Sequence, residues 1–591
     1  MFHLYFDLLK EWCDALLELQ VNEIKSPGIY GGIMCPACSR IHGRCADAVY
    51  PLMYMAHTTG DQRYLEAAVK LQEWSEHVTS PDGSWVNEPE KTWKGITVFG
   101  ALSLAEALRH HGMLLDKTIY DRWRKRLSSA AQYIYNTFTM DYGNINYPIT
   151  ASALLTAAGM VLDDQDYINR GREFAHNSMN YFTENKLIFG EGHGISASGK
   201  RAVDLGYNVE ESLPALALYG VMTGDEEVLR GVTASLREHM EFMLPDGAWD
   251  NSWGTRNYKW SYWGSRTSDG SQSAYLLLAD RDARFAEVAR RNTLLLKNCT
   301  HDGMLYGGPH YFTKGELPCI HHTFCKAKAL ATILDYNLNM DLKTIPTALP
   351  REVAKGVREY PEIGTYLVAQ GDWRATITSY DWEYMKLGHA SGGSLSMLWH
   401  KELGPVLSAS LTEYSMLEST NMQRVKDVID MSLTPRLELT QDGEFYRNIN
   451  DNNAVVKQET LMDEIRFRSM GRLVNGDQKD PSQGEVAYNI EYVFKDNSFE
   501  ILIQGDYTPL TGQLRYYLPM ISDRTEEYVQ EDSNRLHIGK GNNKLTVTAS
   551  LPIISIAADH KRIFNHVPGF EAIPFYLSLK DAKECKIIIA L

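Results

Sequence analysis

A helix with a polar entrance and an apolar body decides the fold. Residues 206–220 read GYNVEESLPALALYG, so an amide, Asn208, and two carboxylates, Glu210 and Glu211, precede a segment that is apolar on most sides. Such a segment predicts an inner, buried helix. Burying the three polar groups costs on the order of several kcal/mol unless they meet partners or a polar ligand. One interpretation is a capping box formed by Asn208 and Glu211, and the other is a binding site.

The same pattern recurs along the first 340 residues, at a period of about 50 to 60 residues. Charged amphipathic segments such as 120–138 and 226–242 alternate with the apolar ones, and Asp-Gly turns follow several of them. Apolar helices are expected to begin near Arg44, Thr97, Asn146, Asn208, Ser268 and His321. This alternation predicts an (α/α)6-7 toroid over residues 1–340.

The polar starts of the inner helices are expected to face one end of the ring. Together they would form one cleft, which favours a functional site over six separate caps. The residues that would line it are Arg44, Asp47, Asn146, Asn208, Glu210, Glu211, Asp269, His321 and His322.

Strand patterns dominate the second half of the chain. Residues 341–355 form a proline-bearing linker, and segments such as 499–507 and 583–591 then alternate or run apolar between Gly-Asn turns. We therefore expect an antiparallel β-sandwich over residues 356–591, with an exposed loop at 475–484. His389 lies in a Gly/Ser turn between two of its first strands, where it is either a solvated loop residue or part of a site between the domains.

One long loop concentrates aromatic and basic residues. Residues 250–266 read DNSWGTRNYKWSYWGSR, which supplies rings that could stack on sugars and charges that could bind an acidic group. Packing of the loop on the ring is the alternative interpretation. The residues expected to bind substrate are Glu210, His193, Arg256, Arg266, Trp253, Trp260, His321, His322 and Asn146.

Composition excludes several classes of protein. The 591 residues carry a formal net charge of −16, which argues against a general nucleic-acid or membrane-surface binder. No apolar run approaches the roughly 18 residues of a membrane helix. The first 20 residues predict an acidic amphipathic helix and no signal peptide, so the sequence as it stands fits the cytoplasm, or the periplasm if a signal peptide has been removed. A homo-oligomer is compatible with these features.

Four potential metal ligands lie within eleven residues. Cys35, Cys38, His42 and Cys45 have the ligand types of a structural zinc site, although their spacing is tighter than in common zinc fingers. Small buried thiols are the alternative. Eight cysteines are too few for a disulfide framework in a chain of this length.

Asn208 and Glu211 stand at an inner-helix start, a tyrosine follows about fifty residues later, and His389 lies in a Gly-rich turn. Together with the predicted toroid and sandwich, these residues resemble the heparinase II/III-like polysaccharide lyases. The resemblance covers nearly the whole chain and extends to polysaccharide lyase family 27, which acts on glucuronate. It implies that Asn208 neutralises the substrate carboxylate, Glu211 assists, Tyr258 or Tyr262 is the catalytic tyrosine, and His389 comes from the sandwich. The sequence departs from the alginate lyases by an Asn-Val in place of Asn-His, which favours another substrate.

The resemblance implies β-elimination from a uronic acid of an acidic oligo- or polysaccharide, without a cofactor for the chemistry. A first alternative is an exo-acting hydrolase of the glycoside hydrolase family 154 type, with paired carboxylates drawn from Glu210 or Glu211 and Glu191, Asp250 or Asp269. A second is a carbohydrate-binding protein without turnover. An unsaturated product would separate the lyase from both.

Overall fold

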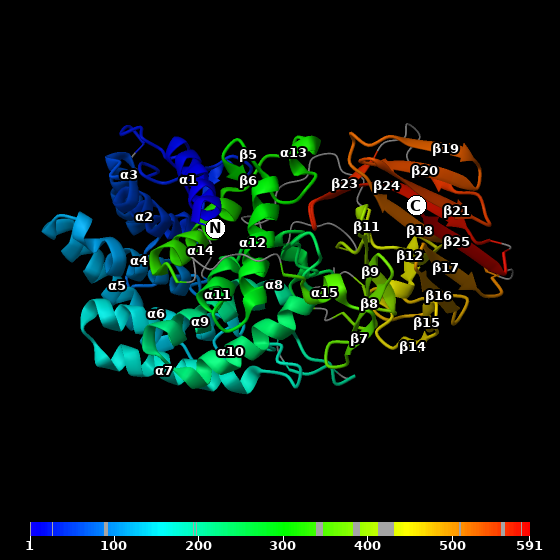
Figure 1. The fold of residues 1–591 in the computed structure, drawn as a ribbon, viewed down its shortest axis with the longest axis horizontal. Coiled ribbons are helices and arrows are strands. Elements are labelled where there is room, and N and C mark those ends of the chain that lie inside the picture. The colour runs from blue at the N-terminus through cyan, green and yellow to red at the C-terminus, as the bar shows by residue number, and fades with distance from the viewer. Residues whose placement is uncertain are drawn as a thin grey trace.

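The computed structural model describes residues 2–26, 28–87, 93–192, 194–196, 198–338, 347–381, 384, 390–411, 431–507, 510–556, 562–580 and 582–591. Helices occupy one lobe and strands the other (Figure 1). The predicted combination of a helical toroid and an antiparallel sandwich is therefore confirmed.

Six buried inner helices close into a ring among the described residues. Each packs on the next, and the last, α14, returns to the first, α2. The inner elements are α2 (Val49–Thr59), α4 (Thr97–His111), α6 (Asn146–Leu162), α8 (Leu205–Tyr207) continued by α9 (Leu213–Thr223), α11 (Gln272–Leu277) and α14 (Ile320–Tyr336). The outer helices are α1 (Phe2–Glu18), α3 (Gln62–Trp74), α5 (Lys117–Thr137), α7 (Gln165–Ser178), α10 (Glu226–His239) and α12 (Ala283–Asn298).

The two layers begin their helices differently. An aspartate caps each of α3, α5, α7, α10 and α12 by accepting a hydrogen bond from a backbone N–H of the first turn. Within the described residues, α2, α4, α6, α11 and α14 have no side-chain cap. The polar side chains at the starts of these inner helices therefore do not cap them.

The inner helix that carries Asn208 begins one turn earlier than the sequence suggested. Asp204 is its cap, and residues Asn208–Ser212 form a π-helical turn between α8 and α9. Pro214 explains this turn because it lacks the N–H that would bond the carbonyl of Glu210, and that carbonyl accepts from Gly270 N instead. The capping-box interpretation of Asn208 and Glu211 is therefore wrong.

The sandwich lobe is built from antiparallel sheets. The first, in the order β11-β10-β9-β8-β7, adjoins the ring, and all three sheets contribute side chains to one apolar core (Figure 1). The first sheet contains β7 (Gly356–Tyr360), β8 (Thr365–Gln370), β9 (Trp373–Thr378), β10 (Ser394–His400) and β11 (Gly404–Ser408). The second contains β12 (Arg436–Gln441), β13 (Glu444–Arg447), β18 (Gln513–Ile521), β22 (Ile554–Ser555), β23 (Ile563–Asn565) and β24 (Phe570–Ser578).

The third sheet has eight strands, in the order β14-β15-β16-β17-β25-β21-β20-β19. The predicted loop at 475–484 joins two of them, β15 and β16. Its members are β14 (Val455–Thr460), β15 (Glu464–Arg472), β16 (Ala487–Lys495), β17 (Ser498–Gln504), β19 (Tyr528–Asp532), β20 (Arg535–Lys540), β21 (Asn543–Ala549) and β25 (Glu584–Ala590).

Buried polar contacts join the two lobes. Arg351, on the short helix α15 (Pro350–Val353) within the predicted linker, donates to Asp250 Oδ2 over 2.6 Å. The Asp381 carboxylate, just after β9, accepts from Gly254 N at 2.9 Å and from Asn257 Nδ2 at 2.7 Å. The aromatic loop 250–266 of the ring is therefore held in place by the sandwich.

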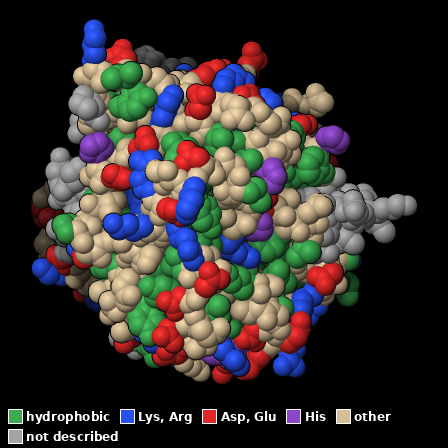
Figure 2. Space-filling model, turned by 90° about the vertical axis from the view of Figure 1, so that its left-hand side faces the viewer, with side chains coloured by type: hydrophobic (Ala, Val, Ile, Leu, Met, Phe, Trp, Pro, Cys, Tyr) green, Lys and Arg blue, Asp and Glu red, His purple; other side chains and the backbone are tan. Residues whose placement is uncertain are grey.

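On the end of the ring opposite the sandwich, acidic and basic side chains of the described residues are interspersed (Figure 2). Of the helices in the described part of the chain, none combines the length and the apolar character needed to cross a bilayer.

Candidate functional site

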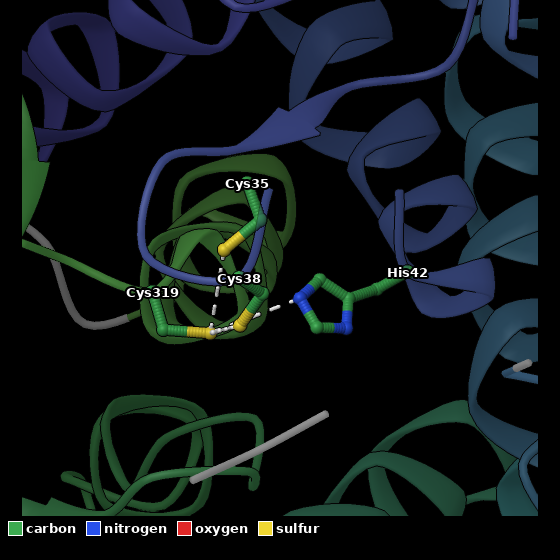
Figure 3. A group of neighbouring side chains, drawn as sticks. All are labelled: Cys35, Cys38, His42 and Cys319. Atoms are coloured by element: carbon green, nitrogen blue, oxygen red, sulfur yellow. Dashed lines mark hydrogen bonds between the residues drawn. The ribbon is translucent and has the colours of Figure 1, made fainter. Parts of the chain in front are cut away.

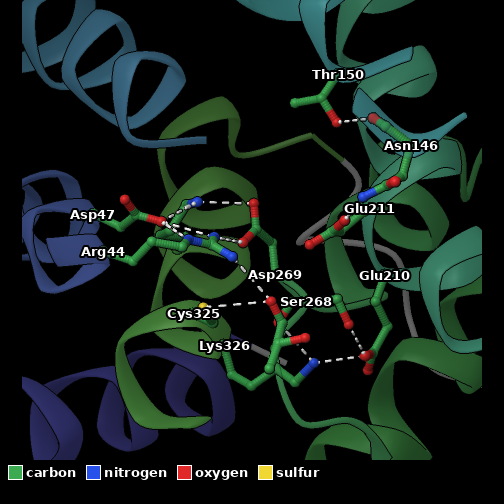
Figure 4. A network of polar contacts seen from close by, with 12 residues as sticks. Arg44, Asp47, Asn146, Thr150, Glu210, Glu211, Ser268, Asp269, Cys325 and Lys326 are labelled. Carbon is green, nitrogen blue, oxygen red and sulfur yellow. Dashed lines mark hydrogen bonds and ion pairs between the residues drawn. The ribbon is translucent and has the colours of Figure 1, made fainter. Parts of the chain in front are cut away.

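A cavity lies inside the ring, between the inner helices. Glu211 from the π-helical turn, Thr150 from α6, and Asp269 and Lys328 from the opposite side line it. Figure 4 shows Glu211 and Asn146 on one side of this space and Arg44, Asp47 and Asp269 on the other. The ring interior therefore presents a carboxyl and an amide opposite a group of ion pairs.

Glu211 is held by one amide. Its Oε2 accepts a hydrogen bond from Asn146 Nδ2 at 2.6 Å, and its Oε1 has no hydrogen-bond partner among the described residues. Burial raises the pKa of Glu211 to about 8, and the nearby Asp269 carboxylate adds to the rise. At neutral pH Glu211 is thus a neutral acid that can donate a hydrogen bond into the cavity.

The neighbouring Glu210 also lines the cavity but makes more contacts, all through one oxygen, and its Oε1 has no hydrogen-bond partner among the described residues. Its Oε2 accepts from Lys326 Nζ at 2.6 Å, Ser268 Oγ at 2.6 Å and Ser265 N at 2.7 Å (Figure 4). These contacts join the inner helix to α14 and to the aromatic loop. They anchor Glu210 in the wall that lines the cavity, and its predicted contact with substrate stays a prediction.

The ion pairs across the cavity balance one another. Arg44 Nη2 lies 2.8 Å from Asp47 Oδ2 and 3.0 Å from Asp269 Oδ1, and Lys328 Nζ bridges the same two carboxylates at 3.1 and 2.8 Å. Two cations thus meet two anions, so these carboxylates are already neutralised without a metal ion.

A second group of polar residues surrounds Tyr207. The Arg256 guanidinium lies over the Tyr207 ring at 4.2 Å, and Lys259 Nζ donates to Tyr207 Oη at 3.4 Å. Arg256 Nη1 also pairs with Glu191 Oε2 at 3.3 Å. Burial raises the pKa of Glu191 to about 7, against the lowering effect of Arg256. These two cations give the site the positive charge that an acidic sugar requires.

Three aromatic residues border this group. Tyr258 stacks on Tyr384 of the sandwich lobe with ring centroids 6.4 Å apart, and its phenol interacts with the charge of Arg256. Trp93 stacks on Tyr142 and is 44% exposed, while Tyr384 is 40% exposed. Exposed rings beside buried cations are suited to bind a sugar chain.

Tyr262 does not reach this group. Its hydroxyl donates to Asp246 Oδ2 at 2.8 Å, and its ring packs edge-on against Phe570. Burial raises the pKa of Tyr262 well above its usual value, and Asp246 raises it further. Of the two tyrosines that the resemblance offers, Tyr258 is therefore the better candidate.

Two predicted sugar platforms belong to the core. The indole of Trp253 packs against Phe242, and that of Trp260 donates to Trp249 O at 3.0 Å; both are buried. Their loop folds over the ring and covers them. The packing interpretation of the loop is correct for these residues.

Asn208 faces away from Glu211. Its Nδ2 donates to Ile188 O at 3.0 Å and lies 3.1 Å from His239 Nε2 of the outer helix α10. Because the π-helical turn rotates Asn208 into the wall, Asn146 is the amide beside Glu211. The role that the resemblance gives to Asn208 stays a prediction, and Asn146 is a second candidate for it.

The remaining predicted residues divide between the wall and the rest of the chain. His322 Nε2 accepts from Arg266 Nε at 3.3 Å, and both side chains are buried near Trp263. His321 is buried at the start of α14, 5.9 Å from the ring of His42. His193 and His389 lie outside the described residues.

Comparison with known proteins places the chain in a family. The ulvan lyase N-terminal domain matches residues 9–352, and the ulvan lyase C-terminal domain matches residues 357–591. A broad-specificity ulvan lyase of Formosa agariphila is 40% identical over 99% of this chain and 93% of its own length. This chain belongs to the ulvan lyase family.

Solved structures support the fold of this ulvan lyase family member. A heparinase III matches with a TM-score of 0.52 at 10% identity over 99% of this chain and 84% of its own. The chondroitin AC lyase of Streptomyces coelicolor A3 matches with a TM-score of 0.53 at 11% identity over 100% and 79%. The predicted heparinase-like fold is confirmed, and the family of the chain is that of the ulvan lyases.

The enzyme class follows from the family. The protein is a polysaccharide lyase, as predicted from the resemblance. The hydrolase alternative has no support in these matches, and Asp250, one of its carboxylates, is instead paired with Arg351 between the lobes.

The ulvan lyase chain also contains a group of possible metal ligands. Cys35, Cys38, His42 and Cys319 place their ligand atoms within 4.8 Å of one another (Figure 3). Cys45 was predicted as the fourth ligand, but it lies outside this group. Its buried thiol is hydrogen-bonded to the backbone of Ile33. The fourth ligand of the group is Cys319, at the start of α14.

Several residues of the site were missed in the sequence. Tyr207 lies in the segment 206–220 and Lys259 in the loop 250–266, so both belong to stretches whose composition already indicated a site. Asp381 and Cys319 had no local signal because their partners are more than a hundred residues away.

Proposed function

We propose that this lyase cleaves a uronate-containing acidic polysaccharide, with ulvan as the preferred polymer, by β-elimination at a glucuronate-type residue. The neutral Glu211 beside Asn146, close to the cations Arg256 and Lys259, carries the proposal. The 40% identical ulvan lyase supports the choice of polymer.

The chemistry begins with the uronate carboxylate. A base must remove the proton from C5, and the negative carboxylate next to it disfavours the carbanion that forms. A neutral Glu211, the amide of Asn146 and the guanidinium of Arg256 are groups that stabilise such a carboxylate by hydrogen bonds and charge. We assign carboxylate neutralisation to these three residues.

Tyr258 is the proposed base and acid. As a phenolate beside Arg256 it takes the C5 proton, the C4–O4 bond breaks, and its electron pair leaves with O4 while C4 and C5 become doubly bonded. The Tyr258 phenol then returns the proton to O4, which restores the enzyme. His389 and His193 are sequence-based candidates for an opposite-face base.

Binding of the polymer is assigned to the exposed rings. Trp93 and Tyr384 flank the buried cations and come from the ring and the sandwich, respectively. A chain lying between the two lobes would contact both. This arrangement explains why Asp381 fixes the loop that carries Arg256 and Tyr258.

Product analysis tests the proposal. Ulvan treated with the enzyme in ¹⁸O-labelled water should give fragments with an unsaturated uronate, which absorbs in the ultraviolet, and no label at the cleaved bond. Carboxyl-reduced ulvan, which keeps the backbone but lacks the uronate charge, should resist cleavage. Labelled, saturated fragments would overturn the elimination, and equal cleavage of the reduced polymer would overturn the role of the carboxylate.

A further inference from the structure

We propose that Cys35, Cys38, His42 and Cys319 bind one structural zinc ion that fastens the two ends of the helical ring together. This site is separate from the elimination chemistry, and its residues have no role in the mechanism above.

A tight hairpin prepares the first two ligands. Strands β1 (Met34–Cys35) and β2 (Arg40–Ile41) pair so that Cys35 lies opposite Arg40, and Ser39 N donates to Cys35 O at 2.9 Å. Ser39 adopts a φ of 51°, which closes the turn and leaves the Cys38 thiol beside that of Cys35 (Figure 3). Two thiols from one short turn are a common half of a zinc site.

The third thiol comes from a residue that is far away in the sequence, at the start of the last inner helix. Cys319 precedes the first turn of α14, and Ile320 N donates to Cys35 Sγ at 3.5 Å. The Cys319 Sγ lies 3.8 Å from Cys35 Sγ, 4.0 Å from Cys38 Sγ and 4.0 Å from His42 Nε2. A backbone N–H that points at a sulfur atom is the kind of contact that stabilises a thiolate.

These distances fit a metal ion better than a disulfide. Zn–S bonds of about 2.3 Å at a tetrahedral angle put two sulfur atoms about 3.8 Å apart, and a Zn–N bond of about 2.0 Å puts sulfur and nitrogen about 3.5 Å apart. A disulfide would require about 2.05 Å. The three thiols and one imidazole also match the Cys₃His ligand set of structural zinc sites, in which no position is left for water.

The location explains what such an ion would do. Residues 35–42 lead into the first inner helix, and Cys319 begins the last one, which closes the ring by packing on α2. Helix α14 also supplies Lys326 to Glu210 and Lys328 to the ion pairs around Asp269. A zinc ion here would fix the start of the helix that completes the wall of the cavity.

Metal content of matched cysteine variants tests the site. The purified wild type should contain about one zinc ion per chain by mass spectrometry of the native protein and by elemental analysis. Cys319→Ser should lose it, whereas Cys325→Ser, on the same helix, and Cys45→Ser, in the same loop, should keep it. Retention of zinc by Cys319→Ser, or equal loss in all three variants with folded proteins, would contradict the assignment.

A second measurement covers the case in which Cys319→Ser does not fold. Wild type exchanged with Co²⁺ should show the charge-transfer absorption of three thiolate ligands, and the spectrum should be unchanged in Cys325→Ser and Cys45→Ser. A wild type that binds neither zinc nor cobalt, or a disulfide joining Cys35 to Cys38 or Cys319 in the peptide map, would overturn the proposal.

Discussion

Glu210 and Glu211 are adjacent in sequence but belong to two different regions of the ring. Glu210 is anchored in the wall by Lys326, Ser268 and the backbone of Ser265, which all bond its Oε2, while its Oε1 has no partner among the described residues. Glu211 points into the cavity, where Asn146 is its one hydrogen-bond partner among the described residues and burial keeps it protonated. The difference shows that the partners of a buried carboxyl, more than its identity, separate a structural role from a functional one.

The largest expected effect is on stability, and it separates the two glutamates. Glu210→Gln leaves the buried Lys326 ammonium without its counter-ion, so we expect a loss of about 3–5 kcal/mol in the free energy of unfolding. Glu211→Gln should change stability by less than about 1 kcal/mol but lower kcat about 100-fold. Urea unfolding and initial rates on ulvan measure both.

The comparison fails if the two variants behave alike. Equal destabilisation with full activity per folded molecule in Glu211→Gln would place Glu211 in the wall as well. Circular dichroism of both proteins identifies the folded fraction on which the rates are based.

The two asparagines give the next largest effect. Asn146→Ala removes the amide beside Glu211 and should lower kcat by about 10- to 100-fold. Asn208→Ala removes contacts with Ile188 and His239 and should cost about 1–3 kcal/mol of stability while kcat is kept. A drop in kcat for Asn208→Ala alone would restore the role that the family resemblance suggested.

Much of the fold could be predicted from the sequence because the signals are local. The apolar segments beginning near Thr97 and Asn146 became α4 and α6 at those residues, since their periodicity and burial agree. The aspartates before α3 and α10 likewise have a local capping role.

The site could be predicted only in part because distant contacts decide side-chain directions. Pro214 and Gly270 together produce the π-helical turn that moves Asn208 into the wall. Tyr258 and Tyr262 lie four residues apart in an irregular loop and are both buried, and contacts with Asp246 and Phe570 hold the Tyr262 side chain. Residue types were therefore predictable where orientations were not.

A smaller effect concerns pH. Because burial raises the pKa of Glu211 to about 8, its neutral form predominates below that pH and is lost above it. Asp269 raises this pKa, while Arg44, Asn146 and Arg256 lower it. The kcat of the wild type should therefore fall by up to about tenfold per pH unit above pH 8.

The free energy of unfolding also falls with rising pH, but at lower pH: the unfolded chain loses the Glu211 proton near the ordinary value of 4.5 and the folded chain near about 8, so stability is lost between these values and levels off above them. Glu211→Gln should lack both changes, and rates and unfolding curves from pH 6 to 10 test this. An alkaline decline of equal size in Glu211→Gln would assign it to another group.

The smallest expected effect concerns the aromatic residues. Trp93→Ala removes an exposed ring from the edge of the site and should raise KM several-fold, about 1 kcal/mol of binding, with kcat unchanged. Trp260→Phe, in the core, should lower stability without changing KM. Steady-state kinetics on ulvan fragments distinguish them, and an unchanged KM in Trp93→Ala would remove Trp93 from the binding surface.

The central claim is that elimination takes place where Tyr258 and the cations meet, and the paired variants Tyr258→Phe and Tyr262→Phe test it most directly. The measurement is the rate at which the ultraviolet absorbance of the unsaturated uronate appears with ulvan as substrate. We predict that Tyr258→Phe loses at least about 100-fold in rate with its unfolding midpoint unchanged, and that Tyr262→Phe stays active but is less stable. Full activity in Tyr258→Phe, with the loss in Tyr262→Phe instead, would contradict the account.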